Sequence, residues 1–265
     1  SSDVCSSDLV RKVYELISDP DVSAKEIAEV IETDQVIATR VLKIANSAYF
    51  GMGGKISSVQ HASVVLGFKT IGEIVTIAGA KGTLAKKLPG YGYDTKDLWE
   101  HSLAVAVGSK IISEMRKPDL ANEAYTAGLI HDVGKIILDP YVLAEQEQIF
   151  DYMEKKEKTF LDAENLFFDC NHAEIAYEIC KKWNFPESLS ISIKGHHDPA
   201  DSGNAELSYI IHMADFAARM VGIGYDDDDF LYTLKEGTMS HLGLKKEDVN
   251  NIVSQIVESM EKLSN

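Results

Sequence analysis

Apolar residues recur at intervals of three and four positions through most of the chain from Val10 onward, as in Ile27, Val30 and Ile31. This spacing is typical of helices that bury one face. The strict alternation expected of half-buried strands is not convincing anywhere in the sequence. The pattern therefore predicts an all-α fold.

Prolines and capping residues divide this pattern into short helices, because proline ends or starts a helix and Ser, Thr, Asp and Asn satisfy its first amide groups. In the first part of the chain we expect three helices after the segment that contains Val10. They run from a cap at Asp21 to Ser23 through Glu32, from Thr33 or Asp34 through Ala45, and from Ser57 or Ser58 onward with Val59, Ala62 and Val65 facing inward.

Residues 87–93, Lys-Leu-Pro-Gly-Tyr-Gly-Tyr, discourage any regular element because they contain two glycines and a proline. We expect two helical lobes to join there, with an amino-terminal bundle over 10–93 packed on a second lobe over 94–221. Residues 222–265 form a helical tail with an acidic run, Asp226–Asp229. The helices expected beyond the join run from Asp94 or Thr95 through Met115, across Ala121 to Ile130 with Gly134 releasing the chain from helix geometry, and over Asn171–Trp183, Leu207–Val221 and Glu247–Lys262.

The first nine residues repeat the tripeptide Ser-Ser-Asp and share no helical pattern with the sequence that follows. We interpret residues 1–9 as a non-native remnant and exclude them from fold reasoning.

Composition narrows the class of protein. With 42 Asp and Glu against 26 Lys and Arg, the net charge of −16 argues against attraction to nucleic-acid backbones or anionic lipid. A helix pair over 24–45 faintly resembles a helix-turn-helix, but packing explains its few basic residues better. No apolar run is long enough to span a membrane, and three cysteines without paired spacing suggest no disulfide framework, so we expect a cytoplasmic protein.

An ordered series of histidine and aspartate side chains is the main chemical signal. Neutral imidazole nitrogen and anionic carboxylate oxygen together suit iron, manganese or zinc. A single histidine in a helical protein is more often a surface or core residue than a ligand, and we interpret His61 and His212 as core or boundary residues. The ordered set indicates a metal site. Its seven candidate ligands are His101, His131, Asp132, His172, His196, His197 and Asp215.

Residues 94–220 resemble the HD superfamily of metal-dependent phosphohydrolases. The matching segments are His101-Ser-Leu-Ala-Val, residues 128–135 (Gly-Leu-Ile-His-Asp-Val-Gly-Lys) and Ala214-Asp215. The additional histidines resemble the HD-GYP branch. Residues 10–93, with Leu42-Lys-Ile-Ala-Asn-Ser-Ala-Tyr-Phe-Gly and Ile56-Ser-Ser-Val-Gln-His, are similar to the amino-terminal lobe of HDOD proteins.

The resemblance implies a bacterial signalling or output module that acts through a protein partner and retains a site for two divalent ions. In this arrangement Asp132 bridges an ion held by His101, His131 and Asp215 to an ion held by the other three histidines. The alternative is an active phosphohydrolase on a nucleotide or cyclic dinucleotide, with Asp132 and Lys135 as catalytic residues and Lys135 steadying a phosphate. Residues 198–203, Asp-Pro-Ala-Asp-Ser-Gly, lack the motif that usually follows the paired histidines in cyclic di-GMP hydrolases.

Overall fold

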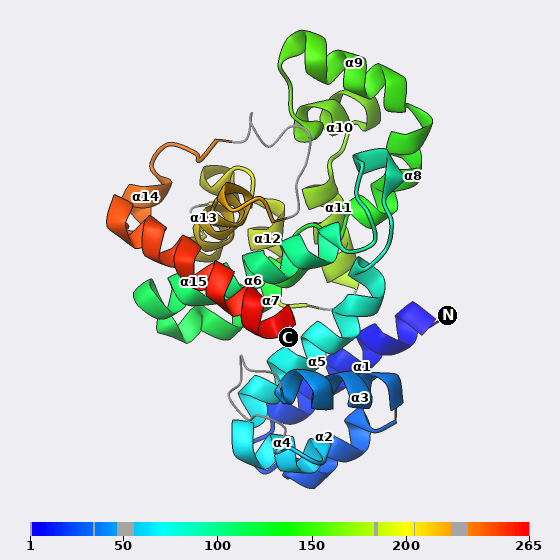
Figure 1. Cartoon of the computed structure of the whole chain (residues 1–265), viewed down its shortest axis with the longest axis vertical. Coiled ribbons are helices and arrows are strands. Elements are labelled where there is room, and N and C mark those ends of the chain that lie inside the picture. Colours follow the sequence, from blue (N-terminus) through cyan, green and yellow to red (C-terminus); the bar gives the residue numbers. More distant parts are fainter. Residues whose placement is uncertain are drawn as a thin grey trace. The chain divides into compact units, whose positions relative to one another are not determined.

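The computed structural model describes residues 2–33, 35–46, 56–182, 185–203, 205–223 and 233–264, which divide into two compact units. Residues 1–83 and 258–265 make up the first unit, and residues 84–257 make up the second. Helices account for the regular structure of the described residues, which form no strand beyond one antiparallel bridge between Leu88 and Tyr93. The all-α prediction is confirmed (Figure 1).

The first unit buries an aliphatic core among short helices. Ser23 begins α2 with a capping box, in which Glu26 bonds back to the Ser23 amide, and Ile27 and Ile31 on its inner face are fully buried. Helix α1 begins at Ser2, within the segment for which the sequence indicated no helical pattern. The helices are α1 (Ser2–Ile17), α2 (Ala24–Ile31), α3 (Gln35–Ala45), α4 (Val59–Leu66) and α5 (Phe68–Leu84).

Two expectations for α4 are wrong. Val65, in the last turn of α4, is 44% exposed, although it lies three residues after the buried Ala62. His61 is exposed rather than a core or boundary residue. The proposed caps at Ser58 and Ser23 are confirmed, whereas Asp34 lies outside the described residues.

The second unit centres on α6, which packs along α7 and α13 (Figure 1). The inner faces of these helices are small and aliphatic, as in Ala104, Leu129 and Ile210, so the helices approach closely. The elements are η1 (Pro89–Tyr91), α6 (Asp97–Arg116), η2 (Pro118–Leu120), α7 (Ala121–Ile130), α8 (Lys135–Ala144), α9 (Gln146–Lys156), α10 (Phe160–Phe168), α11 (His172–Lys182), α12 (Glu187–Lys194), η3 (Pro199–Ser202), α13 (Glu206–Met220) and α14 (Thr238–His241), with α15 (Lys246–Ser264) reaching residue 257 within this unit.

Two local expectations in this unit need correction. Neither Asp94 nor Thr95 caps α6; residues 94–97 form a turn in which the Asp97 carboxylate accepts the Asp94 amide at 2.6 Å, and the helix begins at Asp97. Gly134 keeps right-handed helical angles, φ −63° and ψ −28°, and does not release the chain from helix geometry. Trp183 and the acidic run Asp226–Asp229 lie outside the described residues.

Candidate metal centre

Helix ends and helix faces of the second unit bring the seven candidate ligands together. His101 lies in the early turns of α6, His131 follows the last residue of α7, and His172 begins α11. The paired histidines follow the carboxyl end of α12, and Asp215 lies on α13. Their ligand atoms form three overlapping groups, each within 4.8 Å, that could hold a metal: Asp132, His172, His196 and His197; His101, His131 and Asp132; and His131, His196 and Asp215.

Asp132 is the centre of this cluster. Its Oδ1 atom lies 3.2 Å from His172 Nε2, 3.5 Å from His131 Nε2 and 3.6 Å from His196 Nε2. Its Oδ2 atom lies 3.8 Å from His101 Nε2 on the other side. One carboxylate therefore faces histidines from four different segments of the chain.

Three of the candidate ligands are oriented by a hydrogen bond from the Nδ1 atom to a backbone carbonyl. His131 and His196 each donate to a backbone carbonyl three residues earlier, Gly128 and Ile193, at 2.7 Å. His101 donates to the Ile223 carbonyl at 3.1 Å. Because a carbonyl only accepts, each of these rings carries a proton on Nδ1, and Nε2 is the ring nitrogen directed at the cluster.

His172 differs, because its Nδ1 atom donates to a carboxylate instead. Glu164 on α10 lies 2.7 Å from this nitrogen and also accepts the His172 backbone amide at 2.9 Å. The second Glu164 oxygen accepts the Tyr91 hydroxyl at 2.6 Å. Sequence reasoning missed Glu164, since no regular spacing links it to His172 and nothing but its position on an apolar helix marks it.

The inward-facing atoms of the cluster lack hydrogen-bond partners among the described residues. Buried polar atoms are nearly always hydrogen-bonded, so this convergent group without hydrogen bonds, in which Asp132 has ion-pair neighbours only, indicates a site for a cation. This observation, together with the nitrogen and carboxylate composition, fits a divalent transition metal. The atoms are the Nε2 atoms of His101, His131 and His196, both carboxylate oxygens of Asp132, and Oδ2 of Asp215.

The electrostatics of the cluster favour anionic carboxylates. Burial alone would raise the pKa of Asp132, but the nearby His131 and Lys135 outweigh it and hold that pKa well below its usual value. Burial acts likewise on Asp215, and Arg219, whose Nε lies 3.0 Å from Oδ1, reverses the effect and lowers its pKa. Arg219 was also missed, although its spacing of four residues from Asp215 on a helix was a usable signal.

The same balance between burial and neighbouring charges makes some histidines of the cluster neutral and leaves His172 protonated. Burial and then neighbouring imidazoles hold the pKa of His196 and of His197 well below the usual value, so these rings are neutral at pH 7. Burial also opposes the charge on His172, but Glu164 and Asp132 outweigh it and raise its pKa to about 9. Without a bound cation, His172 therefore holds a proton at pH 7.

Lys135 lies inside the protein, 2% exposed, rather than at its surface. Its Nζ atom is 3.0 Å from Asp132 Oδ2 and donates to the Tyr93 hydroxyl at 3.2 Å. It also lies 5.6 Å and 5.2 Å from the ring centroids of Tyr91 and Tyr93. The charge of Lys135 is thus directed at the Asp132 carboxylate.

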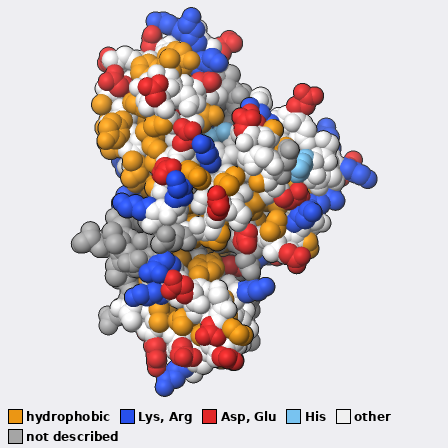
Figure 2. Space-filling model, turned by 180° about the vertical axis from the view of Figure 1, so that it is seen from behind, with side chains coloured by type: hydrophobic (Ala, Val, Ile, Leu, Met, Phe, Trp, Pro, Cys, Tyr) orange, Lys and Arg blue, Asp and Glu red, His pale blue; other side chains and the backbone are white. Residues whose placement is uncertain are grey.

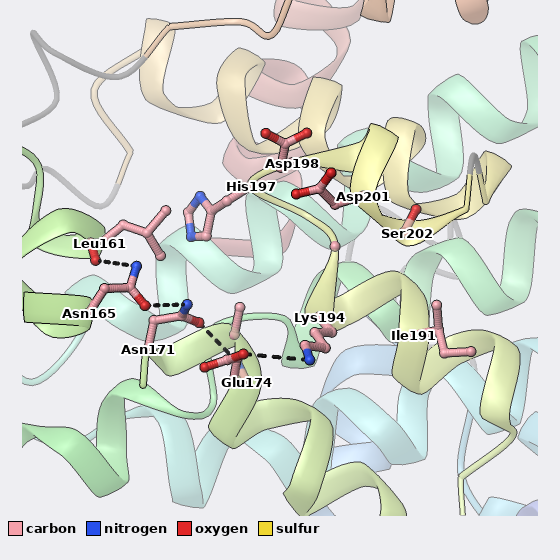
Figure 3. A pocket seen from close by; sticks show the side chains of 12 residues that line it. Leu161, Asn165, Asn171, Glu174, Ile191, Lys194, His197, Asp198, Asp201 and Ser202 are labelled. Carbon is pink, nitrogen blue, oxygen red and sulfur yellow. Dashed lines mark hydrogen bonds and ion pairs between the residues drawn. The ribbon is translucent and has the colours of Figure 1, made fainter. Parts of the chain in front are cut away.

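A pocket of about 510 Å³ opens beside the cluster and reaches it at His197 (Figure 3). In the close-up, His197 points into the pocket and Lys194 pairs with Glu174 at 3.5 Å. Asp198 on the rim is 2.9 Å from Lys235. Carboxylates outnumber cationic groups in the lining, which is Leu161, Asn165, Asn171, Ala173, Glu174, Ile191, Lys194, Gly195, His197, Asp198, Asp201 and Ser202.

His212 is buried beside the cluster without facing into it, as the core interpretation predicted. Its Nδ1 atom donates to the His196 carbonyl at 2.8 Å, and its Nε2 atom accepts the Lys235 amide at 3.0 Å. Both ring nitrogens are thereby used for structure.

No helix among the described residues is long and apolar enough to cross a membrane. Figure 2 shows basic side chains interspersed with acidic ones over the face drawn there.

Comparison with known proteins places these features in a family. The model of the HDOD domain matches residues 5–199. A crystal structure of an HDOD domain protein with unknown function from Geobacter sulfurreducens is 25% identical, with a TM-score of 0.79 over 97% of this chain and 91% of that one. A structure from Shewanella amazonensis SB2B, named "Putative phosphohydrolase", is 22% identical with a TM-score of 0.75, covering 97% and 92% of the two chains, and shows the shared fold.

An uncharacterized protein of Treponema pallidum (strain Nichols) is 25% identical in an alignment of 199 residues that covers 71% of this chain. The matched region spans 36% of that relative's length.

Proposed function

This chain belongs to the HDOD domain family, and from that premise we propose that it is a bacterial signalling module whose second unit binds two divalent transition-metal ions and acts through a protein partner. The observation that carries the metal proposal is the set of buried nitrogen and oxygen atoms around Asp132 that have no hydrogen bond. Signalling through a partner rests on family membership, a weaker warrant than the geometry of the site.

We assign one ion to His101, His131, Asp132 and Asp215, and a second to His172, His196 and His197, with Asp132 as the shared ligand. The short distances from Asp132 Oδ1 and Oδ2 to histidines on opposite sides support a bridging role. Two of the three metal-ligand groups follow this division and share Asp132, whereas the third joins His131 and Asp215 of the first subsite to His196 of the second. Iron, manganese and zinc all suit this donor set.

Burial favours a regulatory site over a catalytic one. A catalytic metal keeps a position open to substrate, whereas a structural one is enclosed by protein. His101, His131, Asp132, His196 and Asp215 are fully buried. The side chains of Lys135 and Arg219 already pair with the carboxylates of Asp132 and Asp215, so neither side chain is directed at a bound phosphate. Bound ions would stabilise the folded second unit, which is the state that a partner would recognise.

A metal-dependent phosphohydrolase is the second candidate, and the pocket at His197 favours it. Two ions sharing a bridge would supply a water of lowered pKa and positive charge for the oxygens of a phosphoester. Lys194 and the asparagine side chains of the lining would bind and orient the substrate. The carboxylates of Glu174, Asp198 and Asp201 in the same lining oppose an anionic ligand.

Metal content tests the proposal. Protein purified without an affinity chelator would be analysed by mass spectrometry beside Asp132→Ala and the control His61→Ala, which changes an exposed histidine. We expect about two ions per chain in the wild type and the control, and a loss of both in Asp132→Ala. A folded wild type that binds no added Mn²⁺, Fe²⁺ or Zn²⁺ would refute the metal site.

Hydrolysis assays then separate the two candidates. The loaded wild type would be incubated with a panel of phosphodiesters, nucleotides and cyclic dinucleotides. The regulatory proposal expects no turnover above that of metal-depleted protein. Turnover that disappears in Asp132→Ala but persists in His61→Ala would establish the phosphohydrolase instead.

A further inference from the structure

We infer that Glu164 is a positioning residue that makes the His172, His196 and His197 subsite the tighter of the two metal subsites. This inference rests on the proposed pair of ions. It adds a residue outside the ligand set and an order of binding to the site.

Glu164 is held rigidly against His172. The carboxylate is fully buried, and its Oε2 atom accepts both the backbone amide and the Nδ1–H group of His172, at 2.9 Å and 2.7 Å. Its Oε1 atom accepts the Tyr91 hydroxyl at 2.6 Å and lies 2.9 Å from the same ring nitrogen. These contacts fix the ring plane of His172, and its Nε2 atom lies 3.2 Å from Asp132 Oδ1.

On the opposite side of the cluster, no carboxylate of the described residues accepts a hydrogen bond from a ring Nδ1 atom. The Nδ1 atoms of His101 and His131 donate to the neutral carbonyls of Ile223 and Gly128. Asp215 carries a cation instead, since the Nε atom of Arg219 is 3.0 Å away. The two subsites therefore differ in charge although they share Asp132.

This difference has a direct consequence for binding. A carboxylate that accepts the Nδ1–H group of a ligating histidine raises the basicity of the other ring nitrogen. A guanidinium on a ligating carboxylate draws charge away from the metal and weakens that ligand. The first ion therefore binds at the His172 subsite, and the second binds more weakly beside Asp215.

A titration of metal-free protein with Co²⁺ tests this order, read by visible absorption and by calorimetry, so that enzymatic turnover is not needed. The wild type should show two binding steps. At pH 9, Glu164→Gln should weaken the tighter step by about 10- to 100-fold, the usual effect of removing such a partner, and leave the weaker step unchanged. Arg219→Gln should do the reverse and tighten the weaker step.

Asp248→Asn is the matched control. Asp248 is a half-buried carboxylate of the same unit that pairs with Arg116 at 3.0 Å and contacts neither Glu164 nor the turn that contains Tyr91. Its variant should keep both binding constants. Circular dichroism and urea unfolding would establish that each variant folds. If Glu164→Gln does not fold, Tyr91→Phe replaces it as the test. This variant removes one hydrogen bond to Glu164 and should weaken the tighter step by a smaller factor.

The outcomes are separable. Two steps in the wild type with both constants unchanged, or equally weakened, in Glu164→Gln overturn the inference and leave the two-ion proposal standing. A Tyr91→Phe variant with wild-type constants overturns it equally where Glu164→Gln does not fold. A wild type that takes up no Co²⁺ overturns the proposed function and this inference together.

Discussion

The backbone of Gly134 lies so close to the carbonyl oxygen of His172 that a Cβ atom at residue 134 would overlap it. The glycine is therefore required by this approach and not by its backbone angles, which any residue adopts. Through this contact the turn that follows Asp132 packs directly against the first residue of α11. The same contact brings the His172 ring to the Asp132 carboxylate.

Gly134→Ala should consequently damage both stability and the metal site. We expect a loss of about 1–3 kcal/mol in the free energy of unfolding, the typical result of overpacking, together with weaker binding at the His172 subsite. Urea unfolding and metal titration measure the two effects. Gly72→Ala is the control, because its nearest neighbours are the ends of side chains at 3.2 Å or more. Equal behaviour of the two variants would contradict the role of Gly134.

Lys135→Met should make stability depend on metal. Removing the lysine leaves His172 as the remaining cation beside the buried Asp132 carboxylate, and breaking one buried pair costs about 3–5 kcal/mol. Bound ions would compensate the same carboxylate, so adding metal should restore most of the loss. Thermal unfolding with and without Mn²⁺ measures this difference. Lys194→Met, at a half-exposed pair with Glu174, should change stability by less than about 1 kcal/mol in either condition.

Metal uptake should release a proton from His172. The pKa of this ring is raised to about 9, so at pH 7 the ring is protonated and the ion must displace that proton. Because the proton competes with the ion, the apparent affinity of the His172 subsite should rise by about tenfold per pH unit between pH 7 and pH 9. Above pH 9 the affinity should no longer depend on this proton. Calorimetry in two buffers of different ionisation enthalpy counts the protons. In Glu164→Gln the plateau should begin at lower pH, and an affinity of the wild type that is flat between pH 7 and 9 would refute the linkage.

His212→Leu should reduce stability without changing metal content. The substitution leaves the His196 carbonyl and the Lys235 amide without their partner, and each such loss costs about 1–3 kcal/mol. Metal analysis and urea unfolding of one preparation give both readings. His61→Leu, at an exposed histidine, should alter neither. Loss of an ion in His212→Leu would mean that this histidine also supports the metal site.

The helical fold could be predicted because its signals are local. The helical period and capping residues such as Ser23 and Ser58 act within one or two turns, and both serines cap as expected. The HDOD resemblance is confirmed by the family model. The gathering of the seven candidate ligands into one cluster was predictable only through that resemblance, because periodicity does not say which helix ends meet.

The unpredicted features depend on contacts between distant segments. Glu164 and Tyr91 are 73 residues apart and meet through a buried hydrogen bond that leaves no pattern in the sequence. Gly134 was interpreted from its usual local role, whereas its actual role is the close approach of His172. At Asp94, side-chain bonding within a turn competed with capping and delayed the start of α6.

The turn at residues 88–93 gives the metal centre a reporter outside its ligands. Leu88 and Tyr93 exchange two backbone hydrogen bonds of 3.0 Å, and within this turn Tyr91 bonds to Glu164. The amide protons of Leu88 and Tyr93 can exchange with solvent only when those backbone bonds break, an opening that strains the bond between Tyr91 and Glu164. An ion that immobilises His172 should therefore slow deuterium uptake in this turn, although the turn contains no ligand.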